Sequence, residues 1–248
     1  MVENPYATPK ARTEANSSRR RPSSKLKSTK SLAYSCVIML LVFIVGAVIC
    51  ILCHSEALSF VGTNTNPFFT ENGVPTDLRQ RFSTGQLIQV SGVLGTILFV
   101  CIWSYYSMKN AWVLRLKHDM PSISAGWAAG WYFIPLANYW MPLKATYQIW
   151  TTTFRERKSP IILWLWWFCW VNATFVMSIV RKLNTGPFPS MESAIKLEIA
   201  QRGAMIGAAV FLCVIVLQIS YGQSKYIQRG RSWCWLVAFT RATSTPLM

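Results

Sequence analysis

The sequence LAYSCVIMLLVFIVGAVICIL, residues 32–52, contains no charged side chain. A helix needs about 20 mostly apolar residues to cross the roughly 30 Å hydrocarbon core of a bilayer, and this run is long enough. Three further charge-free runs, residues 87–107, 161–180 and 203–221, meet the same requirement. The sequence therefore predicts an all-α integral membrane bundle with four transmembrane helices.

The overall composition favours the same class. Of the 248 residues, 52% are hydrophobic and 14% are charged, and the formal net charge is +16. Typical soluble chains contain about 25% charged residues. Because a mean hydropathy of +0.28 accompanies the positive charge, the charges must be segregated from the apolar runs. This excludes disorder as the main state, disfavours a water-soluble enzyme, and gives no reason to expect a nucleic-acid partner.

Different roles are expected for the segments outside the spans. Residues 1–30 contain eight basic and two acidic residues without apolar periodicity, which predicts a disordered basic cytoplasmic tail. Its length indicates that the first span is a retained anchor and not a secretory signal. Anionic head groups of membrane lipids are the expected partner of the tail. Residues 31–221 form the predicted membrane domain, and residues 222–248 a cytoplasmic C-terminal segment in the membrane interface.

The segment 126–150 is apolar and aromatic, yet it contains Pro135, Asn138, Pro142 and Lys144. If it enters the membrane and returns to the same side, 18 of the 25 Lys and Arg residues fall on one face and six on the other. A full crossing gives the weaker bias of 15 against nine. Since basic residues mark the cytoplasmic side, we expect a re-entrant or interfacial helical element, with both termini in the cytoplasm.

A spaced series of aromatic, asparagine and proline residues gives a family resemblance. Trp103 and Asn110 close the second predicted span. The series that follows consists of Trp127, Trp131, Phe133, Pro135, Asn138, Pro142 and Trp150. From about residue 87 to residue 221, the chain resembles the bacterial domain-of-unknown-function family 4328. The resemblance implies a multi-pass protein of the bacterial cytoplasmic (inner) membrane, and it implies no known chemistry.

The two prolines of this series interrupt the predicted helical element. Each proline deprives the carbonyl four residues earlier of its helical partner, here the carbonyls of Trp131 and Asn138. In lipid, such polar groups must be covered by protein or open to water. One interpretation is a kinked packing element in which Asn138 satisfies a free carbonyl. The other is a polar notch for a head group, ion or small solute, which the embedded charge of Lys144 favours, unless its side chain extends to the cytoplasmic surface.

Four tryptophans fall within residues 164–170. Trp166 and Trp170 are four residues apart and share one face of a helix. Inward-facing rings could form a wall for a cationic or lipid ligand; packing bulk is the ordinary alternative. The candidate ligand notch therefore comprises Asn138, Lys144, Trp166 and Trp170.

Small residues recur at a spacing of four, as in Gly203 and Gly207. This spacing lets helix backbones approach closely and is a common association device in lipid. It predicts packing within the bundle, with a homo-oligomer formed through the Gly203 and Gly207 face as the alternative.

Cys50, Cys53 and His54 match the short c-type haem attachment pattern. Cys50 still lies in lipid in the predicted topology, which makes it hard to reach, so we favour chance placement. The chain has two His and seven Cys, without the spacing of a metal site, and it has no catalytic motif. We therefore expect no catalytic residues, no metal and no cofactor.

These features favour a multi-pass membrane-embedded binding or interaction protein. The alternative is a small transporter or channel that uses the notch at Asn138 and Lys144. A haem-bearing redox anchor is a remote third hypothesis.

Overall fold

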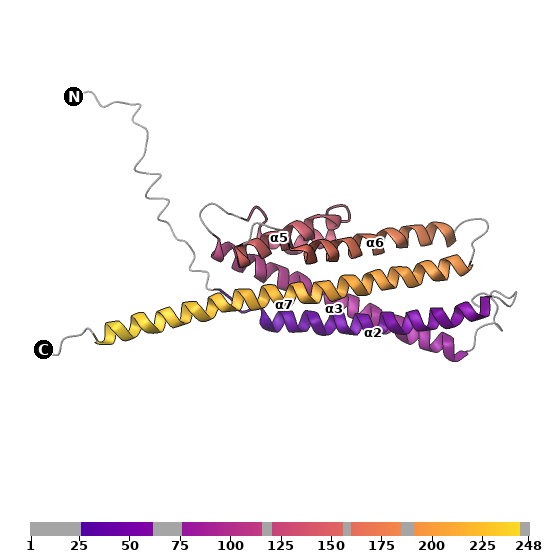
Figure 1. The fold of residues 1–248 in the computed structure, drawn as a ribbon, viewed down its shortest axis with the longest axis horizontal. Helices are drawn as coiled ribbons and strands as arrows, with labels where there is room; N and C mark the ends of the chain where they lie inside the picture. Colours follow the sequence, from indigo (N-terminus) through magenta and orange to yellow (C-terminus); the bar gives the residue numbers. More distant parts are fainter. Residues whose placement is uncertain (1–25, 62–75, 116–120, 156–159, 185–190, 244–248) are drawn as a thin grey trace, which may run out of the picture.

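The computed structural model describes residues 26–61, 76–115, 121–155, 160–184 and 191–243, and every secondary-structure element in these ranges is a helix. Its four longest helices are α2 (Lys30–Val61), α3 (Thr76–Leu114), α6 (Ile161–Asn184) and α7 (Met191–Thr243). Successive long helices run in opposite directions along the bundle, so α2 begins and α7 ends toward the same end (Figure 1).

Three of these helices are long and apolar enough to cross a membrane. The qualifying ranges are Lys30–Ser59 in α2, Thr76–Leu114 in α3 and Glu192–Gln228 in α7. They contain three of the four predicted runs. The corresponding apolar stretch of α6, Ile161–Phe175, is shorter, so a fourth span at α6 stays a prediction.

The helices extend well beyond the charge-free runs. Asp77 pairs with Arg81 at 3.0 Å in the first turns of α3, and Glu192 pairs with Lys196 at 2.5 Å in the first turns of α7. Opposite charges four residues apart stabilise exposed turns of a helix. At its other end, α7 continues as helix over 222–243. That part was expected to form a separate interfacial segment.

Helices α2 and α3 touch through glycines. A Cβ atom on Gly46 would lie 2.4 Å from the backbone nitrogen of Gln89, and one on Gly92 would lie 2.4 Å from that of Phe43. These distances leave no room for a side chain, so the two backbones are in direct contact. Small residues permit such close helix packing, which is a main source of helix association in lipid.

The chain between α3 and α6 forms a broken helical hairpin. It consists of α4 (Ala125–Gly130), two 3-10 turns, η1 (Trp131–Phe133) and η2 (Ala137–Tyr139), and α5 (Met141–Phe154). Pro135 lies between the two 3-10 turns, and Pro142 lies in the first turn of α5. The prolines thus fall where the helix is interrupted.

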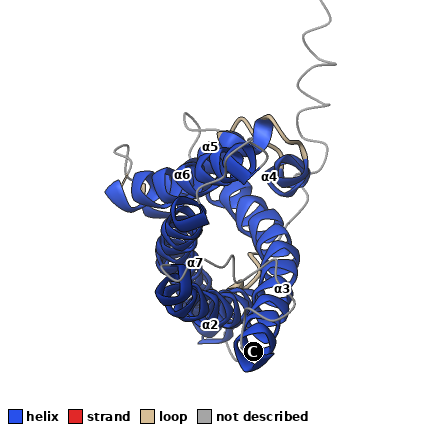
Figure 2. Cartoon of the chain, turned by 90° about the vertical axis from the view of Figure 1, so that its right-hand side faces the viewer, coloured by secondary structure: helices blue, strands red, loops and turns tan. Residues whose placement is uncertain are grey.

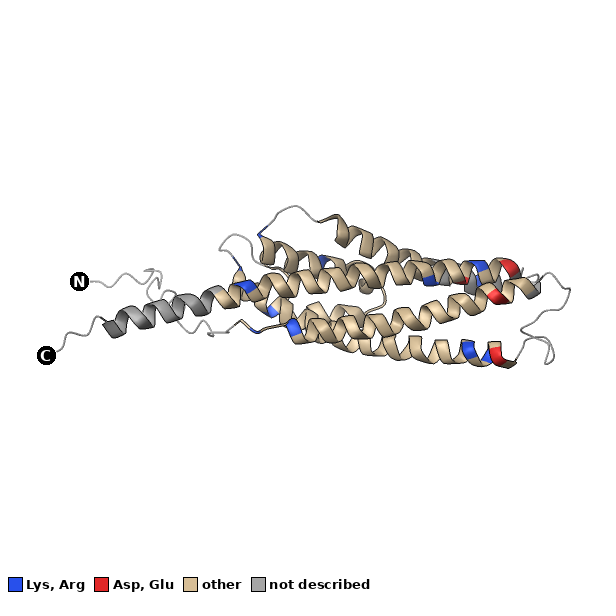
Figure 3. Cartoon of the chain, turned by 60° about the horizontal axis from the view of Figure 1, so that its bottom comes forward, with Lys and Arg blue, Asp and Glu red and all other residues tan. Residues whose placement is uncertain are grey.

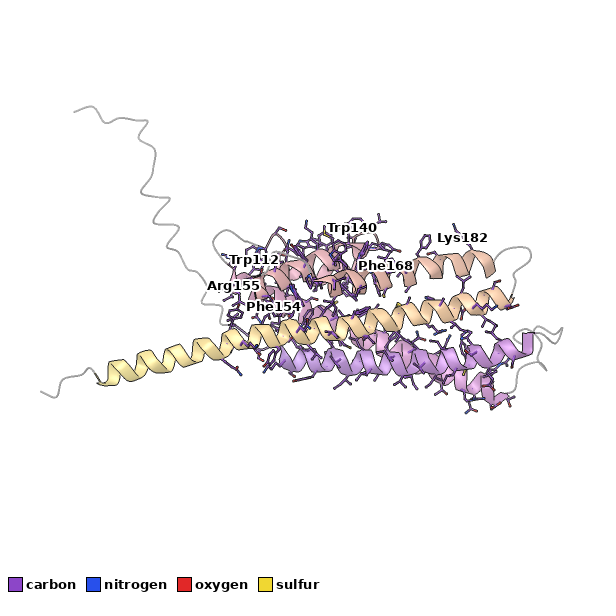
Figure 4. The ribbon with its side chains drawn as sticks, viewed as in Figure 1. Trp112, Trp140, Phe154, Arg155, Phe168 and Lys182 are labelled. Atoms are coloured by element: carbon purple, nitrogen blue, oxygen red, sulfur yellow. The ribbon has the colours of Figure 1, made fainter. Side chains whose placement is uncertain are left out.

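The hairpin turns back partway along the bundle. Trp112 and Arg155, which flank it, lie toward one end of the bundle, whereas Trp140 lies nearer the middle (Figure 4). In the view along the bundle, α2, α3, α6 and α7 surround a central region, with α4 and α5 on one side (Figure 2). Helix α2 packs against α3 and α7, α6 packs against α7, and the hairpin contacts both α3 and α6. The hairpin therefore completes the bundle between α3 and α6, through α4 and α5.

Candidate ligand-binding cavity

A cavity of about 230 Å³ lies where the broken hairpin meets the long helices. Its walls come from α2, α3, α6, α7 and the hairpin, and include Phe43, Thr96, Val100, Tyr132, Asn138, Pro142, Trp166, Trp170, Met205 and Ala208. None of the residues that line it carries a formal charge. The wall is thus mostly apolar, with a few polar atoms.

Asn138 reaches the cavity from the 3-10 turn η2. Its backbone N–H donates to the carbonyl of Ile134 at 2.8 Å, which holds the turn after Pro135. Its side-chain Oδ1 is buried and has no hydrogen-bond partner among the described residues. The Oγ1 atom of Thr96, on the α3 wall, is buried and unpartnered in the same way. A buried polar atom without a partner costs about 1–3 kcal/mol, so a ligand that hydrogen-bonds to these atoms would recover that cost.

The tryptophans of α6 divide into two groups. Trp166, which is buried, and Trp170 both line the cavity. Trp164 is 52% exposed, while the indole Nε1 of Trp167 donates to the carbonyl of Tyr139 at 2.5 Å. That bond ties α6 to the hairpin and fixes the tryptophan wall beside Asn138.

Lys144 lies outside this site. It is on α5, is exposed, and is not among the residues that line the cavity. Of the four residues of the predicted notch, the structure brings Asn138, Trp166 and Trp170 together and leaves Lys144 apart. The embedded charge that suggested an ion or charged head group is therefore absent from the described cavity wall.

The cavity reaches the outer surface of the bundle. Ile97 of α3 and Phe133 of η1 both line it, and they are 43% and 68% exposed. An apolar rim between α3 and the hairpin is thus the entrance that the geometry provides for a ligand arriving from the side of the bundle.

Two residues of the family pattern hold the end of the bundle where α2 begins. The indole Nε1 of Trp103 donates to Ser220 Oγ at 2.8 Å. The Asn110 side chain accepts from the backbone N–H of Lys27 at 3.0 Å, and its Nδ2 donates to the Lys27 carbonyl at 2.7 Å and to Gln223 Oε1 at 2.9 Å. Lys27, which was expected to belong to a disordered tail, is therefore held against the bundle.

Gln223 extends this network to α5. Its Nε2 donates to the Ser107 carbonyl at 3.0 Å and to Thr153 Oγ1 at 3.3 Å. Asn110, Gln223 and Thr153 are all buried. The network joins α3, α5, α7 and the chain before α2, so it holds α5, the second half of the hairpin, against the long helices.

Other residues of the pattern act through packing. The rings of Trp127 and Trp131 stack with their centres 4.5 Å apart, and the Trp150 ring lies 4.5 Å from that of Phe154. Trp127 is half-exposed and Trp150 is buried. The first contact packs α4 against η1, and the second lies within α5.

Gly203 and Gly207 differ in what surrounds them. A Cβ atom on Gly207 would lie 3.3 Å from the Cys169 sulfur of α6, whereas one on Gly203 would meet nothing within 4 Å among the described residues. Gly207 thus packs α7 against α6. Self-association through the face of both glycines stays a prediction.

A second polar cluster, near the other end of the bundle, escaped sequence analysis. The Nδ1–H of His54 donates to the carbonyl of Cys50 at 2.8 Å, and its Nε2 lies 2.7 Å from a carboxylate oxygen of Glu198. Arg202 contacts the same carboxylate at 3.8 Å and donates to Gln89 Oε1. The cluster connects α2, α3 and α7. The four-residue spacing of Glu198 and Arg202 was the one local signal, but nothing in the sequence connects them to His54.

This arrangement does not fit the haem hypothesis. Both ring nitrogens of His54 already have protein partners, which leaves neither of them free to bind iron. Cys50 and Cys53 are both buried. His54 is instead a structural link between helices.

In the part of the chain that the structure describes, all elements are helices and three of them are long and apolar enough to cross a membrane, which indicates a membrane protein. A model of the family described as a domain of unknown function (DUF4328) matches residues 76–221, and the chain belongs to this family. The match begins at α3 and includes the hairpin, α6 and most of the apolar part of α7. No curated protein and no solved structure matches the chain.

Proposed function

We propose that this membrane protein binds a mostly apolar, uncharged ligand with one hydrogen-bonding group in the cavity beside Asn138. The observation that carries the proposal is a pair of buried atoms, Asn138 Oδ1 and Thr96 Oγ1, that have no hydrogen-bond partner among the described residues and lie in a mostly apolar wall. Sites for small molecules commonly combine such a wall with a few placed polar groups. Oδ1 is an acceptor, so the ligand group is a donor such as a hydroxyl or an amide N–H.

The size of the cavity supports a small ligand. Its volume of about 230 Å³ is below the roughly 300–1,000 Å³ of sites for drug-sized molecules. A short-chain alcohol or amide fits this range. The apolar rim at Ile97 and Phe133 supports entry from the hydrocarbon phase.

For the topology, we propose four spans with the hairpin as a re-entrant element and both termini in the cytoplasm of a bacterial cell, with the protein in its cytoplasmic membrane. The bias of 18 basic residues against six supports the orientation. The alternating directions of α2, α3, α6 and α7 (Figure 1) support an even number of crossings. A broken backbone inside a membrane requires cover from protein, and α3 and α6 supply it.

A transporter is the second candidate. Interrupted helices at the substrate site are common in transporters, and the interrupted hairpin lines the cavity here. The position of Lys144 outside the cavity disfavours a charged substrate. A transporter of a neutral solute needs access to the cavity from both sides of the membrane, whereas a binding protein needs only one entrance.

Thermal unfolding of the protein in lipid nanodiscs, with a series of neutral straight-chain alcohols, tests the binding proposal. We expect the alcohols to raise the unfolding temperature of the wild type and to have little effect on Asn138→Leu. Asn172→Leu is the matched control, because the Asn172 amide bonds to Phe168 of its own helix and does not line the cavity. No shift with any alcohol, or an equal shift in both variants, would overturn the proposal.

Accessibility labelling tests the topology separately. Single cysteines introduced at Thr152 and Ser190, in a background without the native cysteines, are treated with a membrane-impermeant reagent. We expect residue 152 to react from the cytoplasmic side and residue 190 from the outside. Labelling of residue 152 from the outside alone would disprove the re-entrant arrangement.

A further inference from the structure

Two lysines from different helices share one aromatic ring near the end of the bundle where α2 begins. The Lys30 ammonium, on the first residue of α2, lies 5.6 Å from the centre of the Tyr221 ring, and the Lys225 ammonium of α7 lies 4.8 Å from it. An aromatic face attracts a cation, which places both charges at the same ring. Two like charges held this way favour an anion near them.

The described part of the chain supplies no such anion. Its acidic residues are Glu56, Asp77, Glu192 and Glu198, and they gather toward the opposite end of the bundle (Figure 3). The ion pairs of Arg81, Lys196 and Arg202 all use one of these four. A third cation, Arg155, lies over the Tyr226 ring at 5.7 Å from its centre. The end of the bundle around Tyr221 is therefore positively charged without compensation from described residues.

Grooves flank these cations. One, of about 300 Å³, is lined by Lys30, Tyr34, Leu217 and neighbouring residues. Another, of about 170 Å³, is lined by Lys225, Tyr226 and neighbouring residues, and both grooves include Tyr221. Each groove thus combines a lysine with aromatic or aliphatic surface.

The apolar surface continues from the first groove along α2. Tyr34, Ile38 and Leu41 are each more than half exposed, and Leu217 of α7 is partly exposed beside them. Charge at one end and a continuous apolar strip along the helices match the shape and polarity of a phospholipid.

We propose that Lys30, Lys225 and Tyr221 form a site for one anionic phospholipid. Its phosphate lies between the two ammonium groups, and an acyl chain follows Tyr34 and Leu217 toward the middle of the bilayer. The site is separate from the cavity beside Asn138 and does not depend on it. It differs from a general attraction between the basic tail and the membrane, because it assigns the phosphate to two lysines on named helices.

The test measures phosphatidylglycerol binding to the detergent-purified full chain by native mass spectrometry. In the double variant Lys30→Gln/Lys225→Gln we expect the affinity to fall about 25-fold, since each near-surface lysine contributes roughly a factor of five. The matched control is Lys109→Gln/Arg115→Gln. It removes the same charge from cations over Tyr105 and Trp112 of α3, and we expect it to retain wild-type affinity. Lys30→Arg/Lys225→Arg should retain binding as well.

Three outcomes would overturn the proposal. An equal loss in the control variant would reduce the effect to net charge. Displacement of the lipid by millimolar inorganic phosphate would assign the site to a free anion and not to a lipid. Equal binding of phosphatidylcholine would remove the requirement for an anionic head group. If the double glutamine variant does not fold, the single variant Lys225→Gln, at an exposed residue, supplies the same comparison.

Discussion

Replacing Asn110 by Leu should destabilise the bundle far more than replacing an amide that bonds only within its own helix, such as Asn172. The change removes three hydrogen bonds, two to the Lys27 backbone and one to Gln223. Side-chain hydrogen bonds between membrane helices contribute about 0.6 kcal/mol on average and up to about 1.7 kcal/mol. In addition, Gln223 Oε1 remains buried without this donor, which costs about 1–3 kcal/mol. Since Lys27 can regain water, we expect a total loss of about 2–4 kcal/mol.

Reversible unfolding in mixed micelles of increasing dodecyl sulfate content measures this loss. Gln223→Leu alone should cost a similar amount, and the double variant should cost at least about 1 kcal/mol less than the sum of the two, because the residues share one network. Asn172→Leu, which removes a hydrogen bond within α6, is the control and should stay near the wild type. Strict additivity of Asn110→Leu and Gln223→Leu, or a loss below about 0.5 kcal/mol for Asn110→Leu, would refute the network as a source of stability.

The same unfolding assay checks the glycine contact, the histidine link and the cavity. Gly92→Ala should cost about 1–3 kcal/mol of unfolding free energy, because its Cβ would overlap the Phe43 backbone. The control Gly203→Ala, which meets no described atom within 4 Å, should be neutral or stabilising. A larger loss for Gly203→Ala than for Gly92→Ala would contradict the described contact between α2 and α3. His54→Leu should cost about 1–3 kcal/mol of unfolding free energy, because it removes the hydrogen-bond donor to the partly buried Glu198. The control Lys196→Gln, which breaks an exposed ion pair, should change the unfolding free energy little. Equal effects of the two substitutions would show that the His54 link does not stabilise the bundle. Ala208→Leu should fill the cavity and abolish the alcohol-dependent shift while the unfolding free energy stays within about 1 kcal/mol of the wild type; a retained shift would place the ligand elsewhere.

The sequence predicted the long helices well because burial in lipid imposes a simple rule on composition. The four charge-free runs fall inside α2, α3, α6 and α7. The ends of the helices were not predicted, because hydropathy changes where a span leaves the bilayer, while the backbone hydrogen bonds of a helix continue through polar turns. The continuation of α7 to Thr243 is the largest such difference.

The candidate site was partly accessible from sequence. Pro135 and Pro142 marked the broken backbone, and this drew attention to Asn138. Trp166 and Trp170 were grouped by helical spacing. Their partners Thr96 and Ala208 carry no local signal for a cavity, because an ordinary residue of an apolar helix becomes part of a cavity wall only through packing.

Contacts between distant helices lay beyond sequence reasoning. Glu198 and His54 are far apart in the chain, and a single sequence does not reveal that they meet. The glycine contact had a weak signal, since Gly85 and Gly92 are seven residues apart and share a face of α3, where a Cβ atom on Gly85 would lie 2.8 Å from the Ile49 side chain.

The unbroken length of α7 has a mechanical consequence. Ala208, in the cavity wall, and Thr243, at the helix end, are joined by continuous helix, which at 1.5 Å per residue separates them by about 50 Å. A helix of this kind acts as a lever arm. A tilt of about 5° at the cavity moves the far end by roughly 4 Å. A small tilt produced by a ligand in the proposed site would thereby be amplified at the end of α7.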